Sequence, residues 1–134
     1  ESMAFWTRHS LSEMGILTGQ SIDRVVVSGG AARLELLLQL KADILNRPVE
    51  FPHLPETAGL GAALLAGTGT GRFRTPQEAL ASLKYEIGVF LPDAGRAGWY
   101  DRIYKKAYLP LYDALKDIHH TLAELSGEKD SATH

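Results

Sequence analysis

The stretch Val25-Val26-Val27-Ser28-Gly29-Gly30-Ala31-Ala32 decides the fold of this chain. Its run of β-branched residues predicts a buried strand, Ile22 to Val27, and the two glycines that follow predict a turn into a helix. Such a turn exposes backbone N–H groups at the helix start, where they bind anions such as phosphate. The stretch therefore indicates a nucleotide site, although the same turn also occurs wherever a chain simply reverses direction.

Hydrophobic periodicity predicts the elements on either side of this stretch. A helix is expected over residues 3 to 18, ended by Gly19, and a second helix over residues 31 to 46. A short strand, residues 49 to 51, follows between two prolines. Because a helix connects the two strands, we expect them to pair in parallel as a right-handed β-α-β unit.

Glycines and alanines mark a third helix, expected over residues 58 to 66. Gly59 and Gly61 leave one face of this helix nearly without side chains, which favours close packing on the sheet. After a glycine-rich loop, Thr75-Pro76-Gln77-Glu78 combines a cap residue, a proline at the first helical position and a glutamate at the end of the motif. This capping box predicts a short helix that ends near residue 87.

A long helix is expected from residue 96 to residue 125, where apolar side chains recur at helical spacing. Pro110 lacks a backbone N–H and should kink or divide this helix near Leu109. The polar residues 126–134 are expected to form a disordered tail behind a domain of residues 1–125. Tyrosines at every fourth position indicate a packing stripe rather than a binding surface; they are Tyr100, Tyr104, Tyr108 and Tyr112.

The bulk composition narrows the class of protein. A chain of 134 residues, 45% hydrophobic and 22% charged, fits one globular domain. A formal net charge of −2 gives no long-range attraction for nucleic acid or anionic membranes, so neither is expected as a partner. No apolar run approaches the roughly 20 residues that span a bilayer, and the absence of cysteine fits a reducing compartment. We therefore expect a cytoplasmic protein and, because a helical pattern begins at once, a piece of a longer one.

No grouping of side chains predicts a metal centre or a catalytic nucleophile. His119 and His120 are adjacent, so they point to different sides of a helix and cannot both bind one ion from there. The other histidines lie in unrelated contexts, and no serine, histidine and carboxylate stand in a recognisable arrangement. Catalytic and metal-binding residues are accordingly not expected in this chain.

The glycine turn has two functional interpretations. In a dinucleotide-binding fold, Glu50 at the end of the second strand would hold a ribose, but the turn lacks the G-x-G-x-x-G spacing of that fold. The other interpretation needs two successive glycines that contact the phosphate and sugar of a nucleotide, which suits Gly29 and Gly30 better.

Further motifs follow this turn in order: Ala42-Asp43-Ile44-Leu45-Asn46-Arg47-Pro48-Val49, Glu56-Thr57-Ala58, Gly61-Ala62-Ala63-Leu64-Leu65-Ala66-Gly67 and Phe90-Leu91-Pro92-Asp93. Together with the turn they resemble the C-terminal part of the FGGY carbohydrate kinases. The combination in order is far more specific than the double glycine alone.

The resemblance implies an α/β fold, part of an actin-like, ribonuclease H-like ATPase domain with a helix-strand-helix-strand-helix core and a long C-terminal helix. It implies ATP and Mg²⁺ as cofactors, with Gly29, Gly30 and Ala31 forming the turn at the phosphates and ribose. Leu34 stands where the family often has Ser or Asn near the base. This departure replaces a polar contact by apolar packing.

The resemblance also implies an ATP-dependent kinase that phosphorylates a sugar hydroxyl, with a ketopentose such as xylulose as the expected acceptor. The family's catalytic base lies before this segment, and the sugar is expected to bind through the missing N-terminal part. We therefore expect the isolated chain to be inactive. A module that binds a nucleotide or a partner without catalysis is the alternative.

The sequence predicts two strands, fewer than a parallel sheet of this class contains. Both edges of a two-stranded sheet carry unpaired N–H and C=O groups. We therefore expect self-association or a complementary fragment that completes the sheet.

Overall fold

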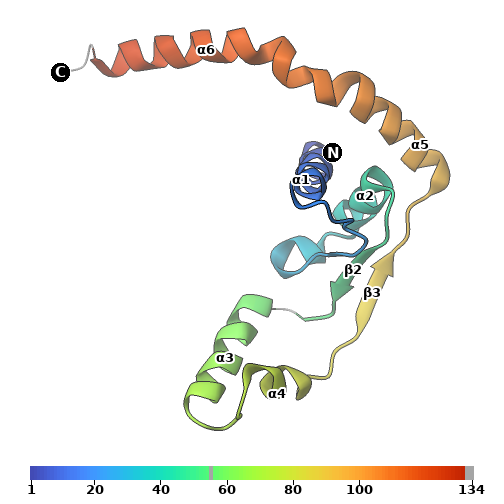
Figure 1. The fold of residues 1–134 in the computed structure, drawn as a ribbon, viewed down its shortest axis with the longest axis vertical. Helices are drawn as coiled ribbons and strands as arrows, with labels where there is room; N and C mark the ends of the chain where they lie inside the picture. Colours follow the sequence, from blue (N-terminus) through green and yellow to red (C-terminus); the bar gives the residue numbers. More distant parts are fainter. Residues whose placement is uncertain (55, 132–134) are drawn as a thin grey trace. The chain divides into compact units, whose positions relative to one another are not determined.

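The computed structural model describes residues 1–54 and 56–131, with side chains described as far as residue 126. The chain divides into two compact units, residues 1–97 and the residues from Gly98 onward, and each is described by itself. Figure 1 labels the larger elements along the chain. In chain order the elements are α1 (Ser2–Thr18), β1 (Val25–Val26), η1 (Gly29–Arg33), α2 (Glu35–Leu45), β2 (Val49–Pro52), α3 (Thr57–Gly69), α4 (Pro76–Ala81), β3 (Ile87–Phe90), α5 (Ala94–Ile103), η2 (Tyr104–Tyr108) and α6 (Leu109–Ser131).

A small sheet in the order β1-β2-β3 lies in the first unit. β1 pairs with β2 in parallel, Val25 opposite Val49, which confirms the β-α-β unit expected around α2. The two-strand expectation is wrong, because β3 pairs antiparallel with β2, Phe90 opposite Val49. The expected helix from Pro76 ends at Ala81 instead of near residue 87, and the chain then extends into β3.

The core of the first unit lies between α2 and strands β1 and β2. Leu38, Ala42 and Leu45 from one face of α2 pack with Val27 and Val49. These three residues recur at the helical spacing that the periodicity of the sequence predicts, whereas Leu36 on the other side of the helix is 75% exposed. α1 lies beside α2, as Figure 1 shows, and Arg8 donates a hydrogen bond to the Ile44 carbonyl.

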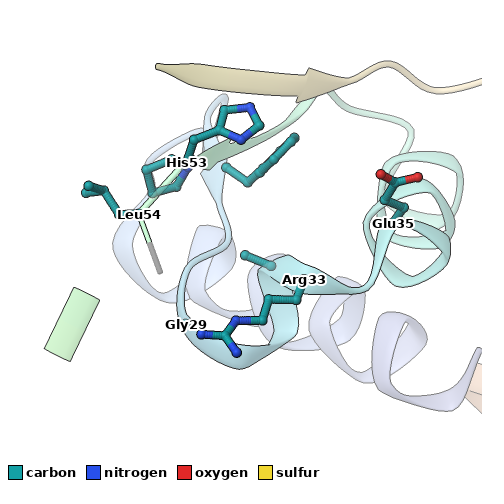
Figure 2. A pocket seen from close by; sticks show the side chains of 8 residues that line it. Gly29, Arg33, Glu35, His53 and Leu54 are labelled. Carbon is teal, nitrogen blue, oxygen red and sulfur yellow. The ribbon is translucent and has the colours of Figure 1, made fainter. Parts of the chain in front are cut away.

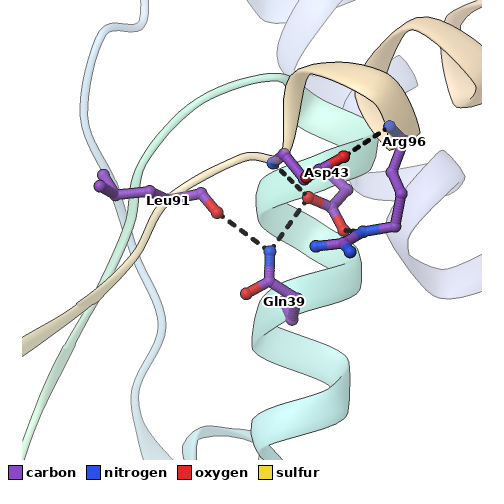
Figure 3. Close-up of polar contacts among 5 residues, drawn as sticks. Gln39, Asp43, Leu91 and Arg96 are labelled. Carbon is purple, nitrogen blue, oxygen red and sulfur yellow. Dashed lines mark hydrogen bonds and ion pairs between the residues drawn. The ribbon is translucent and has the colours of Figure 1, made fainter.

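A buried carboxylate fixes the turn between β3 and α5 onto α2. Asp43, whose side chain is 2% exposed, accepts hydrogen bonds from Arg96 Nε at 2.6 Å, the Asp93 backbone N–H at 2.8 Å and Gln39 Nε2 at 3.0 Å. Gln39 also donates to the Leu91 carbonyl (Figure 3). Burial alone would raise the pKa of Asp43, but these hydrogen bonds and the Arg96 charge outweigh it and lower the pKa.

α3 and α4 form a helical hairpin. The start of α4 agrees with the prediction from the sequence, and the end of α3 does not. The threonine cap is confirmed, since the Glu78 N–H donates to Thr75 Oγ1, whereas the Glu78 carboxylate accepts from the N–H of Arg74, the residue before the cap, instead of from Thr75. α3 does not end at residue 66 but continues to Gly69, and no described residue of α3 is buried. The expected close packing of its small-residue face is therefore wrong, because a Cβ at Gly59 or Gly61 would meet nothing within 4 Å.

The second unit is helical. A π-helical segment, η2, separates α5 from α6 just before Pro110, which confirms that this proline divides the helix near Leu109. The wider i to i+5 turn accommodates a ring that would collide with the carbonyl one α-turn earlier. Of the expected tyrosine stripe, Tyr100 and Tyr104 are buried and Tyr112 is exposed. α6 continues to Ser131 instead of ending at residue 125, and the rest of the expected tail, residues 132–134, lies outside the described residues.

Candidate nucleotide-binding cleft

A cleft of about 400 Å³ opens between the glycine turn and the end of β2. Figure 2 shows Arg33 on the same turn as Gly29, His53 and Leu54 across from it where β2 ends, and Glu35 at the start of α2. The volume lies in the range of roughly 300–1,000 Å³ that is usual for small-molecule sites. Its lining residues are Gly29, Ala32, Arg33, Glu35, Phe51, Pro52, His53 and Leu54.

The main chain at the glycine turn is open toward this cleft. Gly29 has a φ of 74°, in the left-handed region that side-chain-bearing residues rarely adopt. A Cβ built at Gly29 or at Gly30 would meet no atom within 4 Å. A ligand can therefore approach the backbone of this turn more closely than it could approach any residue that carries a side chain.

The structure separates the four residues that the sequence singled out. Gly29 lines the cleft, and Gly30 lies next to it on η1. Ala31 instead packs against the hydrophobic core, and Leu34 is 58% exposed and does not line the cleft. The expected single helix over residues 31–46 is wrong, because η1 ends at Arg33 and α2 begins at Glu35.

Leu34 is the N-cap residue of α2, and no side chain caps the first turn of that helix. Leucine carries no hydrogen-bond acceptor in its side chain, so it cannot satisfy the free N–H groups of the first turn as Ser or Asn does. These N–H groups begin at Glu35, whose side chain lines the cleft. The start of α2 therefore adds polar backbone groups near this site.

Sequence reasoning missed the side chains that form the cleft walls. Arg33 and Glu35 flank Leu34 and could have been found by continuing the motif along the turn. Phe51 and His53 come from β2 and the residue after it, and their rings meet edge to face with centroids 4.7 Å apart. No local signal marks this pair, because it depends on β3: a Cβ at Gly88 would overlap the Phe51 ring and lie 3.1 Å from His53 Nε2.

Two ion pairs set the charges around the cleft. Arg33 lies 2.8 Å from Glu56, the residue before α3, and both side chains are exposed. Glu50, which a dinucleotide interpretation needs for the ribose, does not line the cleft and is bound by Arg24 at 2.6 Å. The hydrogen bond and charge of Glu50 raise the pKa of Arg24. Glu50 is thus engaged elsewhere, which weakens the dinucleotide interpretation.

Within residues 1–54 and 56–131, no three His, Cys, Asp or Glu side chains gather as a metal site. No helix in the described part of the chain is long and apolar enough to cross a membrane.

The sequence is similar to curated glycerol kinases. The glycerol kinase of Carboxydothermus hydrogenoformans is 45% identical over 84 residues, which are 63% of this chain and 17% of that protein. The glycerol kinase of Koribacter versatilis is 41% identical over 97 residues, which are 72% of this chain and 19% of that protein. The chain thus spans less than a fifth of the length of these relatives.

Solved structures confirm the expected fold class. The xylulose kinase from Rhodospirillum rubrum matches with a TM-score of 0.66 and 28% identity over 88% of this chain and 24% of its own. The gluconate kinase from Lactobacillus acidophilus matches with a TM-score of 0.57 and 22% identity over 72% of this chain and 19% of its own, a likeness of fold alone. The chain is therefore a mixed α/β part of an actin-like ATPase domain with a long C-terminal helix.

A family model decides the assignment. The model of the C-terminal domain of the FGGY carbohydrate kinases matches residues 1–70, more than half of the chain. This stretch contains the glycine turn, helix α2 and all the residues that line the cleft. The chain therefore belongs to the FGGY family of carbohydrate kinases, as part of its C-terminal domain.

Proposed function

We propose that this chain forms the nucleotide side of an ATP-dependent carbohydrate kinase and that the cleft beside Gly29 receives ATP. The observation that carries this proposal is the open main chain at Gly29, which borders a cleft of ligand size without an obstructing side chain. Phosphate oxygens accept hydrogen bonds from backbone N–H groups that point into such open turns.

The cleft walls offer complementary chemistry to the two ends of a nucleotide. Arg33 supplies a cation for the phosphates, while Phe51, Pro52 and Leu54 supply apolar surface for the base. Glu35 can accept hydrogen bonds from ribose hydroxyls, because an ionised carboxylate is an acceptor. ATP supplies the phosphoryl group, and these residues hold and orient the nucleotide.

We assign no described residue to Mg²⁺, and the described His, Cys, Asp and Glu side chains form no group of three that could hold a metal ion. We propose that Mg²⁺ binds here through the phosphates of ATP, because magnesium commonly retains waters and uses substrate phosphates as ligands. The catalytic base is proposed to lie outside this chain, which spans less than a fifth of its curated relatives.

For the acceptor we propose a ketopentose such as xylulose, with glycerol as the second candidate. The xylulose kinase structure matches the larger share of the chain, 88%, which supports the first. The glycerol kinases have the higher sequence identity, 45% over 63% of the chain, which favours the second. A protein that contains this chain and its natural upstream segment, assayed with ATP and each acceptor, distinguishes the two.

The nucleotide site is tested with two glycine variants of the chain. Gly29→Ala and Gly71→Ala both place a Cβ on a backbone of positive φ with open space around it, so each should lower the free energy of unfolding by about 1 kcal/mol. Only Gly29 borders the cleft. We expect Gly29→Ala to raise the Kd for ATP about tenfold in calorimetric titrations, and Gly71→Ala to leave it unchanged.

Equal ATP affinity in both variants contradicts the placement of the phosphates at Gly29. A wild-type chain that binds NAD more tightly than ATP contradicts the proposed function as a whole. Thermal unfolding with each ligand provides an independent measure, since a ligand stabilises the state to which it binds.

A further inference from the structure

One charged contact of the cleft is placed where it would compete with a ligand. Among the residues that line the cleft, Arg33 is the one that carries a guanidinium, and this group donates to Glu56 Oε1 at 2.8 Å. Glu56 itself does not line the cleft but precedes α3 at the cleft's edge. The side chains are 62% and 78% exposed, so both can change partners without rearrangement of the core.

We propose that Arg33 is a specificity-determining residue that recognises the phosphates of the nucleotide, and that Glu56 occupies its guanidinium until phosphate displaces the carboxylate. This inference rests on the proposed function, because it assumes a phosphorylated ligand in the cleft beside Gly29. It names Arg33 as the group that distinguishes a phosphorylated nucleotide from a nucleoside. It also names Glu56 as a residue that lowers the affinity for both ATP and ADP.

The geometry of the guanidinium supports an exchange of this kind. A guanidinium presents parallel N–H groups that fit the oxygens of a carboxylate or of a phosphate equally well. Glu56 therefore occupies, at Arg33 Nη2, a donor that a phosphate would also use. An exposed ion pair gives little net stability because water solvates both charges, so the carboxylate is easily displaced.

The charges around the cleft make this competition significant. Glu35 lines the cleft, and Glu56 pairs with Arg33, which is the single arginine of the lining. With Glu56 in place, the positive charge of Arg33 is neutralised at the side where phosphates would enter. Removing the Glu56 charge removes one competitor for the Arg33 guanidinium and a repulsion of the phosphates.

The experiment compares ATP and adenosine binding to the chain by calorimetry at low and high salt. We expect Glu56→Gln to lower the Kd for ATP about threefold and to leave adenosine binding unchanged. Arg33→Gln should raise the Kd for ATP about tenfold, also without an effect on adenosine. The gain in Glu56→Gln should shrink at high salt, because added ions screen exposed charges.

Asp101→Asn is the matched control. Asp101 forms a partly exposed ion pair with Lys105 at 2.8 Å in the second unit, so this variant removes the same charge without changing a residue that lines the cleft. If Glu56→Gln and Asp101→Asn bind ATP equally, or if Glu56→Gln changes ATP and adenosine binding alike, the inference is wrong while the proposed function stands. If the wild-type chain binds neither compound, the proposed function fails and the inference fails with it.

Discussion

Asp43 on α2 holds the turn after β3 and the start of α5 against this helix through hydrogen bonds. It is the buried charged group among the described side chains, and its partners come from α2, the turn after β3 and the start of α5. A buried carboxylate is tolerated when hydrogen bonds and a cation replace its water. Asp43 has donors on both oxygens, so its charge is compensated.

Asp43→Asn should destabilise the chain and change its response to acid. The amide N–H groups of asparagine would face the donors of Arg96 or Asp93. We expect the free energy of unfolding to fall by about 2–3 kcal/mol. This is at or below the loss of about 3–5 kcal/mol that is usual for a broken buried ion pair, because Arg96 is half exposed. The pKa of Asp43 is lower in the folded state than in the unfolded state, so the ionised carboxylate stabilises the fold at pH values above its ordinary pKa of about 3.9. This stabilisation is lost as the pH falls through the lower pKa of the folded state.

Urea unfolding at pH 7 and at a series of lower pH values measures both effects. The wild type should lose stability below about pH 4 more steeply than Asp43→Asn. Asp117→Asn, a change at an exposed residue, is the control and should keep the wild-type slope. Parallel pH curves for the wild type and Asp43→Asn would contradict the assigned role of this carboxylate.

At the scale of elements, β3 contributes to the cleft through Gly88, which leaves space for the Phe51 ring of the cleft wall. Gly88 lies opposite Phe51 in the antiparallel register, and the Phe51 ring covers it. Glycine is unfavourable in a strand unless something fills the space of its missing side chain, and here an aromatic ring does so. The position of the Phe51 ring, and with it the apolar wall, depends on Gly88.

Gly88→Ala should displace the Phe51 ring, lower the free energy of unfolding by about 1–3 kcal/mol and weaken ATP binding. The double variant Gly88→Ala with Phe51→Leu relieves the overlap and should recover part of the stability. Gly61→Ala is the control, because it adds the same methyl group within α3 where nothing lies within 4 Å. This control should be neutral or stabilising, since alanine favours a helix interior over glycine. Urea unfolding of the variants is the measurement, and a Gly88→Ala chain as stable as the wild type would contradict the prediction.

The elements that the sequence predicted well are those with local signals. α1 and the body of α2 follow from periodicity, β2 from the prolines around it, the start of α4 from its cap residue, and the division near Leu109 from a proline. β3 was missed because its exposed and half-buried residues alternate over only Ile87–Phe90, include a glycine and need β2 as a partner. β1 is shorter than expected for the same reason, since residues before Val25 have no strand to pair with among the described residues.

In the cleft, too, only the features with a local sequence signal could be predicted. Gly29 could be predicted because a glycine turn after a strand is a local motif, whereas Phe51 and His53 enter the cleft through the sheet. The break at Leu34 also had no signal, because leucine is a strong helix former and η1 and α2 read as one helix. Local motifs therefore located the turn, and tertiary pairing determined which side chains surround it.

At the scale of the whole molecule, the described structure leaves much apolar surface uncovered. Trp6, Leu17, Leu36 and Leu125 are each more than half exposed. β1 and β3 are the edge strands of the sheet, so the outer backbone groups of β1 have no strand partner within the described residues. The third strand does not remove the reason for expecting self-association, because the sheet still has two edge strands and β1 carries the exposed Val26.

We predict that the chain self-associates in solution, with a weight-average mass above 14.6 kDa that rises with concentration in light scattering. Val26→Lys should reduce this association, because a lysine on an edge strand disfavours pairing with another chain. Leu36→Lys adds the same charge on the exposed side of α2, and it distinguishes strand pairing from general apolar contact. If Leu36→Lys reduces the mass and Val26→Lys does not, helix faces rather than the sheet edge mediate the association. A wild-type mass of 14.6 kDa at every concentration, with strand amides fully protected from exchange, would show that the open edge needs no partner.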